Sequence, residues 1–253
     1  MPRLAILLLG LSVACHADTT IKKRIVTTDS KPPANVEARS EIKEILYKKG
    51  YLRKKENTTA SLADIVNCDS RTGLLVDFKV HEYKTYKIVK FTPSAQIEQY
   101  IEKNPQNAVN IESTTVETGE LKLFFGRPAK HFITTTKRSP DKNNAGGEET
   151  VDAWYIDHET SDNNCAPEYV RTEPYYVVGT ALVMFPQIAR LHHTGPIPMG
   201  LAVKTTATHK ILGANGVPDR TIITIETVEE LSDSPLNPTL FELPAGLHQK
   251  NAH

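Results

Sequence analysis

The stretch VDAWYID, residues 151 to 157, decides how this sequence folds. In a β-strand successive side chains point to opposite faces of the sheet, so Val151, Ala153 and Tyr155 face one side while Trp154 and Ile156 face the other. Both sides are therefore largely apolar. A sheet with one solvated face has a polar residue at every second position, and this stretch does not. We expect the second face of the strand to be covered.

The same two-sided apolarity recurs in four other short runs: LKLFF at 121–125, HFI at 131–133, LLV at 74–76 and IITI at 222–225. Short runs rich in Thr, Val, Ile and Tyr, broken by Gly, Pro, Asn and Asp, are typical of antiparallel β structure. We predict a mainly β protein with a few helices, in which a strongly curled antiparallel sheet forms an open, incomplete β-barrel capped by helices. Full closure into a barrel and packing as a sandwich are the alternatives.

The apolar pattern and the turn residues between the runs predict twelve strands, which cover residues 20–28, 41–47, 51–56, 60–68, 74–80, 84–90, 109–118, 121–125, 130–138, 150–157, 201–212 and 221–231. Two helices are also expected. The first covers residues 94–102, after Pro93 and a capping Ser94. The second covers 180–191, although Pro186 would kink or stop it.

The N-terminus MPRLAILLLGLSVACHA has a basic residue, an apolar run and a small-residue end, which is the pattern of a secretory signal peptide. We expect residues 1–17 to be removed and residues 18–253 to form one domain in the periplasm or cell envelope. The rival interpretation is a lipoprotein cleavage site at SVAC, which would leave an acylated Cys15 and anchor the chain to the outer membrane. Ser12 is a poor match to the branched apolar residue such a site prefers.

The charge balance, 30 basic against 30 acidic residues, argues against nucleic acid as a partner and against an anionic membrane as the main one. The basic runs KK at 22–23, KK at 48–49 and RKK at 53–55 make the first third basic. We interpret them as solvated strand edges rather than as a phosphate-binding patch, because edge lysines also block unwanted strand pairing.

Two cysteines, Cys68 and Cys165, remain if the signal peptide is removed. An even count in an exported chain favours a disulfide over thiol catalysis or metal binding, so we predict a Cys68 to Cys165 bridge. Two separate buried thiols are the alternative.

The sequence offers few candidate catalytic or metal-binding residues. His192 and His193 are adjacent, lack a metal-ligand spacing and are interpreted as loop residues, so we expect no metal or cofactor. The carboxylates and histidine around Asp157 and His158 follow a strand end, which makes a hydrolase the third functional hypothesis. The Gly-x-Ser-x-Gly nucleophile motif and phosphate-binding glycine loops are missing from the sequence.

Several segments together resemble a known family. They are IESTTVETGELKLFFGRPAKHFITTTKR (111–138), ETVDAWYID (149–157), Cys165, VKTTATHKI (203–211) and the closing TVEELSDSPLNPTLFELPAGL (227–247). They resemble exported bacterial proteins of unknown function that are related to the outer-membrane lipoprotein-sorting proteins, the periplasmic carrier and its receptor. The resemblance covers residues 20 to 247 and implies an open β-barrel with an apolar cavity for acyl chains. The long loop from Cys165 to Pro198 departs from the carriers, so no acyl-binding residue is transferred.

The functional expectation is a non-enzymatic envelope protein that binds a lipid or a lipoprotein acyl chain inside the half-barrel. Five residues from the two-sided strands are the candidate lining of the cavity: Leu123, Phe125, Phe132, Trp154 and Ile156. The alternative is a structural or interaction module of the envelope whose core is filled by its own side chains.

Overall fold

One mixed sheet contains every strand that the computed structural model describes. The described residues are 18–31, 39–48, 51–87, 99, 102–103, 108–139, 146–158, 175–178, 187–213 and 217–250. The strands, in chain order, are β1 (Thr19–Asp29), β2 (Arg39–Lys48), β3 (Leu52–Asn57), β4 (Leu62–Asn67), β5 (Thr72–Asp77), β6 (Glu82–Lys87), β7 (Ala108–Phe124), β8 (Arg127–Arg138), β9 (Gly147–Ile156), β10 (Tyr175–Val178), β11 (Gln187–Thr194), β12 (Leu201–Leu212), β13 (Pro218–Ser232) and β14 (His248–Gln249).

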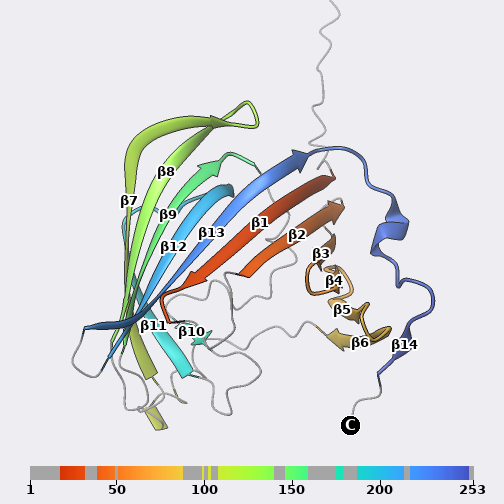
Figure 1. Cartoon of the computed structure of the whole chain (residues 1–253), viewed down its shortest axis with the longest axis horizontal. Helices are drawn as coiled ribbons and strands as arrows, with labels where there is room; N and C mark the ends of the chain where they lie inside the picture. Colours follow the sequence, from red (N-terminus) through yellow and green to blue (C-terminus); the bar gives the residue numbers. More distant parts are fainter. Residues whose placement is uncertain are drawn as a thin grey trace, which may run out of the picture.

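The order of strands across the sheet is β10-β11-β7-β8-β9-β12-β13-β1-β2-β3-β4-β5-β6-β14 (Figure 1). The N-terminal strand β1 lies between β2 and β13, so it pairs with a strand that is distant from it in the sequence. The sheet is not closed, because β10 and β14 are its two ends. Two neighbouring pairs, β11 with β7 and β14 with β6, are parallel. The expectation of a purely antiparallel sheet is wrong at these two pairs.

Bulges and tight turns shape the strands. The predicted strands 109–118 and 121–125 are one strand, β7, whose pairing with β8 shifts register between Glu117 and Leu121. β7 and β8 are joined by two residues, Phe125 and Gly126, which both have positive φ (52° and 72°). Positive φ at both central residues is what a type I′ hairpin turn requires. The turn therefore joins the last pair of the hairpin, Phe124 and Arg127, directly.

The helical cap that was expected is not seen among the described residues. The 3-10 helix η3 (Pro238–Phe241) is the helical element with defined bounds, capped by the Asn237 side chain. Most of the predicted helix 94–102 lies outside the described residues, although Gln99 and Glu102 are helical. The predicted helix 180–191 is wrong where the structure describes it, because residues 187–191 belong to β11 and pair with β7. Pairing with a neighbouring strand overrides the helical spacing of the apolar residues, and Pro186 lies just before β11.

Two apolar clusters lie against the sheet. The first cluster, which we call the central core, gathers residues from β1, β2, β8, β9, β12 and β13: Ile21, Ile45, Tyr47, Ala129, Trp154, Ile156, Leu201, Val203 and Val228. The second, the lateral core, joins Leu46, Ala63, Ile65 and Val76 to Phe241 of η3. Ile45 and Tyr47 point to the opposite face of β2 from Leu46, so the two cores lie on opposite faces at β2.

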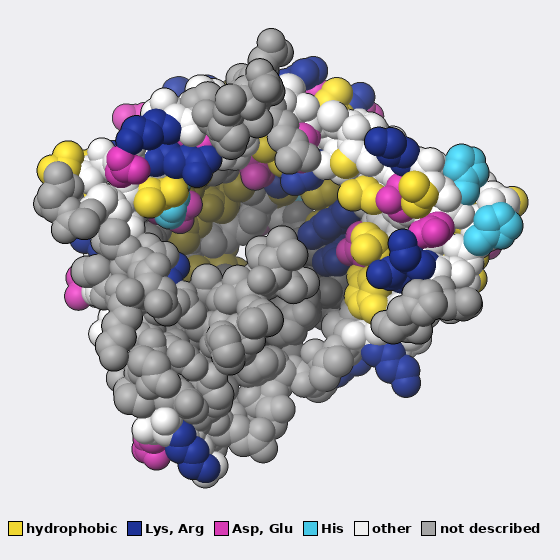
Figure 2. Space-filling model, turned by 60° about the horizontal axis from the view of Figure 1, so that its bottom comes forward, with side chains coloured by type: hydrophobic (Ala, Val, Ile, Leu, Met, Phe, Trp, Pro, Cys, Tyr) yellow, Lys and Arg dark blue, Asp and Glu magenta, His cyan; other side chains and the backbone are white. Residues whose placement is uncertain are grey.

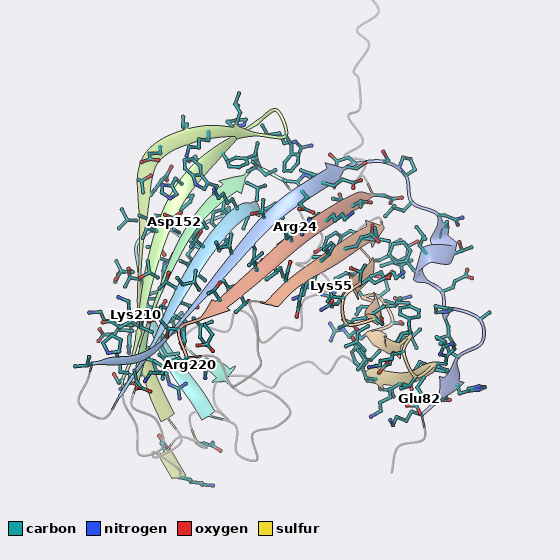
Figure 3. The ribbon with its side chains drawn as sticks, in the orientation of Figure 1. Arg24, Lys55, Glu82, Asp152, Lys210 and Arg220 are labelled. Atoms are coloured by element: carbon teal, nitrogen blue, oxygen red, sulfur yellow. The ribbon has the colours of Figure 1, made fainter. Side chains whose placement is uncertain are left out.

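The ends of the sheet strands are tied by charged contacts. The guanidinium of Arg220 at the start of β13 donates from Nε to both carboxylate oxygens of Asp29 at 2.9 Å (Figure 3). Asp18 accepts a hydrogen bond from the backbone N–H of Leu236 at 2.7 Å, which fixes the segment after β13 beside the start of β1. Among the described residues, no helix has the length and apolar character of a membrane span.

Candidate functional site

Strand β9 is covered on both faces, as the VDAWYID stretch predicts. It lies between β8 and β12, and Ala153, Trp154 and Ile156 are 1%, 5% and 0% exposed. Adjacent residues of a strand point to opposite faces, so burial of both Ala153 and Trp154 shows that neither face of β9 is open to solvent here.

The indole of Trp154 is held by three side chains. The His131 ring stacks on it with ring centroids 4.4 Å apart, the Lys122 ammonium lies 4.4 Å from its centroid, and the Phe124 ring lies 6.0 Å away. His131 is itself fixed, because its Nε2 lies 2.9 Å from the Asp152 carboxylate. The Trp154 position is therefore filled by the protein's own side chains.

The opposite face of the same strands carries a second aromatic pair. Phe132 of β8, which is buried, meets Tyr155 of β9 edge to face with centroids 5.6 Å apart. Burial raises the pKa of the Tyr155 hydroxyl, because the phenolate would be poorly solvated. This part of the sheet is apolar on both sides.

A hollow borders the sheet on one side, and Figure 2 shows hydrophobic side chains together with Lys and Arg side chains inside it. The lateral core and η3 cover one face of β2 to β5. The hollow is therefore on the other face, the one that carries Ile45 and Tyr47 at β2.

Basic residues from three neighbouring strands lie on that same face. Lys23 of β1 is directly opposite Lys43 of β2, and Lys55 of β3 is directly opposite Ile45. Directly opposite residues in an antiparallel pair share a face. We call Lys23, Lys43 and Lys55 the basic stripe; Lys55 is labelled in Figure 3. The stripe adjoins the buried Arg53, which pairs with Asp64 at 3.3 Å.

The five predicted lining residues are separated by the structure. Trp154 and Ile156 belong to the central core, and Phe132 is buried. Leu123 and Phe125 lie at the tip of the β7–β8 hairpin and are 75% and 43% exposed. The structure therefore brings together only Trp154 and Ile156 of these five residues, because Phe132 lies on the opposite face of the sheet.

The region of the hydrolase hypothesis forms a charged cluster. His158 is buried, and the Arg127 guanidinium donates to its Nδ1 at 2.6 Å and to Asp233 at 2.7 Å. Burial lowers the pKa of His158, although Asp233 opposes this effect. These contacts tie the start of β8 and the end of β9 to the segment after β13. Asp157 is exposed.

The structure describes only some of the cysteines and histidines that the sequence singled out. Cys68 is buried beside Val66 and is disulfide-bonded, while Cys165 lies outside the described residues, so the Cys68 to Cys165 pairing stays a prediction. Cys15 is also outside them. His192 and His193 belong to β11 rather than to a loop. In the described part of the chain, no three His, Cys, Asp or Glu side chains are grouped to hold a metal ion.

Sequence reasoning missed the basic stripe and the Arg127, His158 and Asp233 cluster. The prediction of solvated strand edges is wrong for Lys23, because β1 lies between β2 and β13 and the Lys23 side chain is 19% exposed. The alternation of Ile21, Lys23 and Ile25 was the available signal, since it places a lysine between two residues that are buried. Nothing in the sequence pairs Arg127 with Asp233, which is 106 residues away.

The chain is similar in structure to members of the lipoprotein-sorting superfamily at very low sequence identity. A scan of protein-family models and a comparison with curated proteins give no match. A LolA superfamily protein from Nitrosomonas europaea has a TM-score of 0.31 and 7% identity, over 90% of this chain and 91% of that chain. A putative outer membrane lipoprotein-sorting protein domain from Vibrio parahaemolyticus has a TM-score of 0.30 and 11% identity, over 89% of each chain.

An uncharacterized conserved protein from Thermus thermophilus gives a TM-score of 0.38 and 6% identity, over 93% of this chain and 90% of that chain. The likeness concerns the fold. With TM-scores below 0.5, it supports no conclusion about ligand or activity.

Proposed function

We propose that this protein is a non-enzymatic carrier or receptor that binds an apolar ligand, a lipid or a lipoprotein acyl chain, in the hollow of its sheet. In this proposal the sheet acts as the wall of an open, incomplete β-barrel. The observation that carries the proposal is the hollow itself, in which Figure 2 shows hydrophobic side chains. A concave surface lined by apolar side chains is the usual form of a site for apolar ligands.

The proposal includes export. Residues 1–17 have the pattern of a signal peptide, and we propose that residues 18–253 work as one domain in the periplasm or cell envelope. Acylation of Cys15 would instead anchor the same domain to the outer membrane. Intact mass measurement of the protein purified from cell envelopes separates the two forms, because acyl chains add a mass that cleavage after Ala17 does not.

The ligand-binding proposal is tested with a neutral fluorescent probe, N-phenyl-1-naphthylamine, and with dodecanol as competitor. We expect the purified protein to bind the probe and dodecanol to displace it. Ala207 of β12 lies opposite Thr224, which lies opposite Thr27 of β1, so Ala207 is on the same face as the basic stripe. Ala207→Trp adds a large side chain to this face and should weaken probe binding. Thr206→Trp adds the same bulk on the other face and should leave binding unchanged. Absence of probe binding by the wild-type protein would refute the proposal.

The second candidate is a structural or interaction module whose interior is filled by its own side chains. The packing of Trp154 against His131, Lys122 and Phe124 favours it, because at 5% exposure this residue leaves no room for a ligand. The same titration decides between the two candidates. A module would bind neither the probe nor dodecanol, and the two tryptophan variants would behave alike.

A further inference from the structure

The basic stripe is unusual because like charges directly face each other. Lys23 and Lys43 are opposite residues on neighbouring strands, and such a like-charge pair destabilises a sheet. The Lys23 side chain is only 19% exposed, so bulk water screens its charge poorly. A sheet keeps such an arrangement at a cost in stability, and an anion between the two ammonium groups would remove that cost.

Lys55 lies directly opposite Asp64, whereas the carboxylates beside Lys23 and Lys43 lie beyond hydrogen-bond distance. Glu226 lies 3.8 Å from the Lys23 ammonium, and Glu41 lies 3.7 Å from that of Lys43. Both distances exceed the range of an N–H to O hydrogen bond. The Glu41 carboxylate instead accepts a hydrogen bond of 2.9 Å from the side-chain amide of Asn57. The Lys23 and Lys43 ammonium groups therefore keep donors for another acceptor, whereas the buried Arg53 is engaged by Asp64.

Apolar residues of the same face continue directly from the stripe. Ile21 and Ile25 flank Lys23 on β1, and Ile45 and Tyr47 follow Lys43 on β2. All four are buried. Residues two apart in a strand share a face, so these buried apolar side chains and the ammonium groups lie on the same side of the sheet. The hydrophobic and basic side chains that Figure 2 shows together in the hollow match a molecule with an apolar chain and an anionic end.

We propose that the hollow prefers acyl chains that carry an anionic headgroup, a carboxylate or a phosphate, which Lys23 and Lys43 bind. This inference rests on the proposed function, because it names the ligand class of the same hollow. The headgroup accepts hydrogen bonds from the ammonium groups, and the chain lies in the hollow.

The test compares four amphiphiles with one chain length as competitors of N-phenyl-1-naphthylamine: dodecanoate, dodecyl phosphate, dodecanol and dodecyltrimethylammonium. For the wild-type protein we expect the two anions to displace the probe at concentrations about tenfold lower than dodecanol, as charge-assisted hydrogen bonds imply. The cation should be the weakest competitor. The order of dodecanoate and dodecyl phosphate distinguishes a carboxylate from a phosphate headgroup.

The test variant is Lys23→Met with Lys43→Met, and the control is Lys22→Met with Lys54→Met, which removes two positive charges from the other face of β1 and β3. The advantage of the anions over dodecanol should disappear in the test variant and persist in the control. If the test variant does not fold, as judged by circular dichroism, Lys43→Met is compared with Lys54→Met. A reduced anion advantage in Lys43→Met alone supports the proposal, and an unchanged advantage overturns it.

The inference is overturned if the wild-type protein binds dodecanol as tightly as dodecanoate and dodecyl phosphate. It is also overturned if the anion advantage survives in the test variant or is lost equally in the control. In each of these cases dodecanol still displaces the probe and the proposed function stands. Failure of every amphiphile to displace the probe would instead count against the proposed function.

Discussion

At the scale of single residues, burial separates apolar side chains that the sequence treats alike. Ile156 and Leu123 were both expected to line a cavity, but Ile156 is 0% exposed and belongs to the central core, whereas Leu123 is 75% exposed at a hairpin tip. Alternation along a strand indicates which residues share a face. It does not indicate how far the strand extends beyond its neighbours.

Truncation of these two residues should have very different effects on stability. Ile156→Ala removes buried methylene groups and leaves a cavity, so we expect the free energy of unfolding to fall by about 2–5 kcal/mol. Leu123→Ala should change it by less than about 0.5 kcal/mol, since the side chain contacts mostly water. Urea denaturation of both variants measures the difference, and equal losses would contradict the assigned burial.

His158 should make stability depend on pH. Its pKa is lowered by burial, so the unfolded chain takes up a proton on this histidine at a higher pH than the folded chain does. The contribution of neutral His158 is complete above the unfolded pKa, and it is lost as the pH falls from there towards the folded pKa. We expect the melting temperature to fall between about pH 7.5 and about pH 5.5.

Replacement of His158 tests this pH dependence. In His158→Asn a side-chain oxygen can still accept from Arg127 but does not titrate, so the fall in melting temperature should be smaller. His192→Asn changes an exposed histidine and should keep the wild-type slope. An unchanged slope in His158→Asn would assign the pH dependence to other groups.

At the scale of elements, the crossover from β11 to β12 depends on glycine. Gly195 has a φ of 94°, and a Cβ there would lie 1.9 Å from the Thr115 carbonyl oxygen. Gly119, at the bulge of β7, has a φ of 80°, and a Cβ there would meet nothing within 4 Å. Both glycines need a positive φ, which residues with a Cβ rarely adopt. Only Gly195 also lacks the space for a Cβ.

Alanine substitutions at these glycines should separate the two requirements. Gly119→Ala should cost about 1–2 kcal/mol, the usual penalty of left-handed backbone for a residue with a Cβ. Gly195→Ala should cost clearly more, because the loop must also move away from β7. Thermal unfolding monitored by circular dichroism gives both values, and similar losses would indicate that the loop moves freely.

Element prediction succeeded where strands have strong alternation and hairpin turns, as in β1 to β5. It failed at β10, β11 and β14. β11 carries apolar residues at helical spacing, and its strand conformation comes from parallel pairing with β7, which is distant in sequence. β14 has two residues and pairs with β6, so local sequence holds little information about it.

At the scale of the whole molecule, the C-terminal segment covers one face of the sheet. Phe241 of η3 is 7% exposed and packs in the lateral core with Leu46, Ile65 and Val76, whereas its neighbour Leu240 is 40% exposed. The segment does not cover the opposite face, which carries the basic stripe and borders the hollow.

Removal of the Phe241 ring should open the lateral core. Phe241→Ala is expected to lower the free energy of unfolding by about 3–5 kcal/mol and to increase binding of the dye ANS, because apolar residues of β2 to β5 become accessible. Leu240→Ala, in the same short helix, should do neither. Dye binding that is equal in the two variants would show that Phe241 does not seal this face.

The sequence alone determined that the chain is mainly β, where most strands lie, and that strands such as β9 are apolar on both faces. These properties depend on alternation and turn residues, which are local. The tertiary structure decided which face is covered by the C-terminal segment, that β1 lies beside β13, and that Lys23 and Lys43 face each other. Such relations depend on the register between strands far apart in the chain, and each bulge shifts that register by a residue, so the alternation within one strand does not contain it.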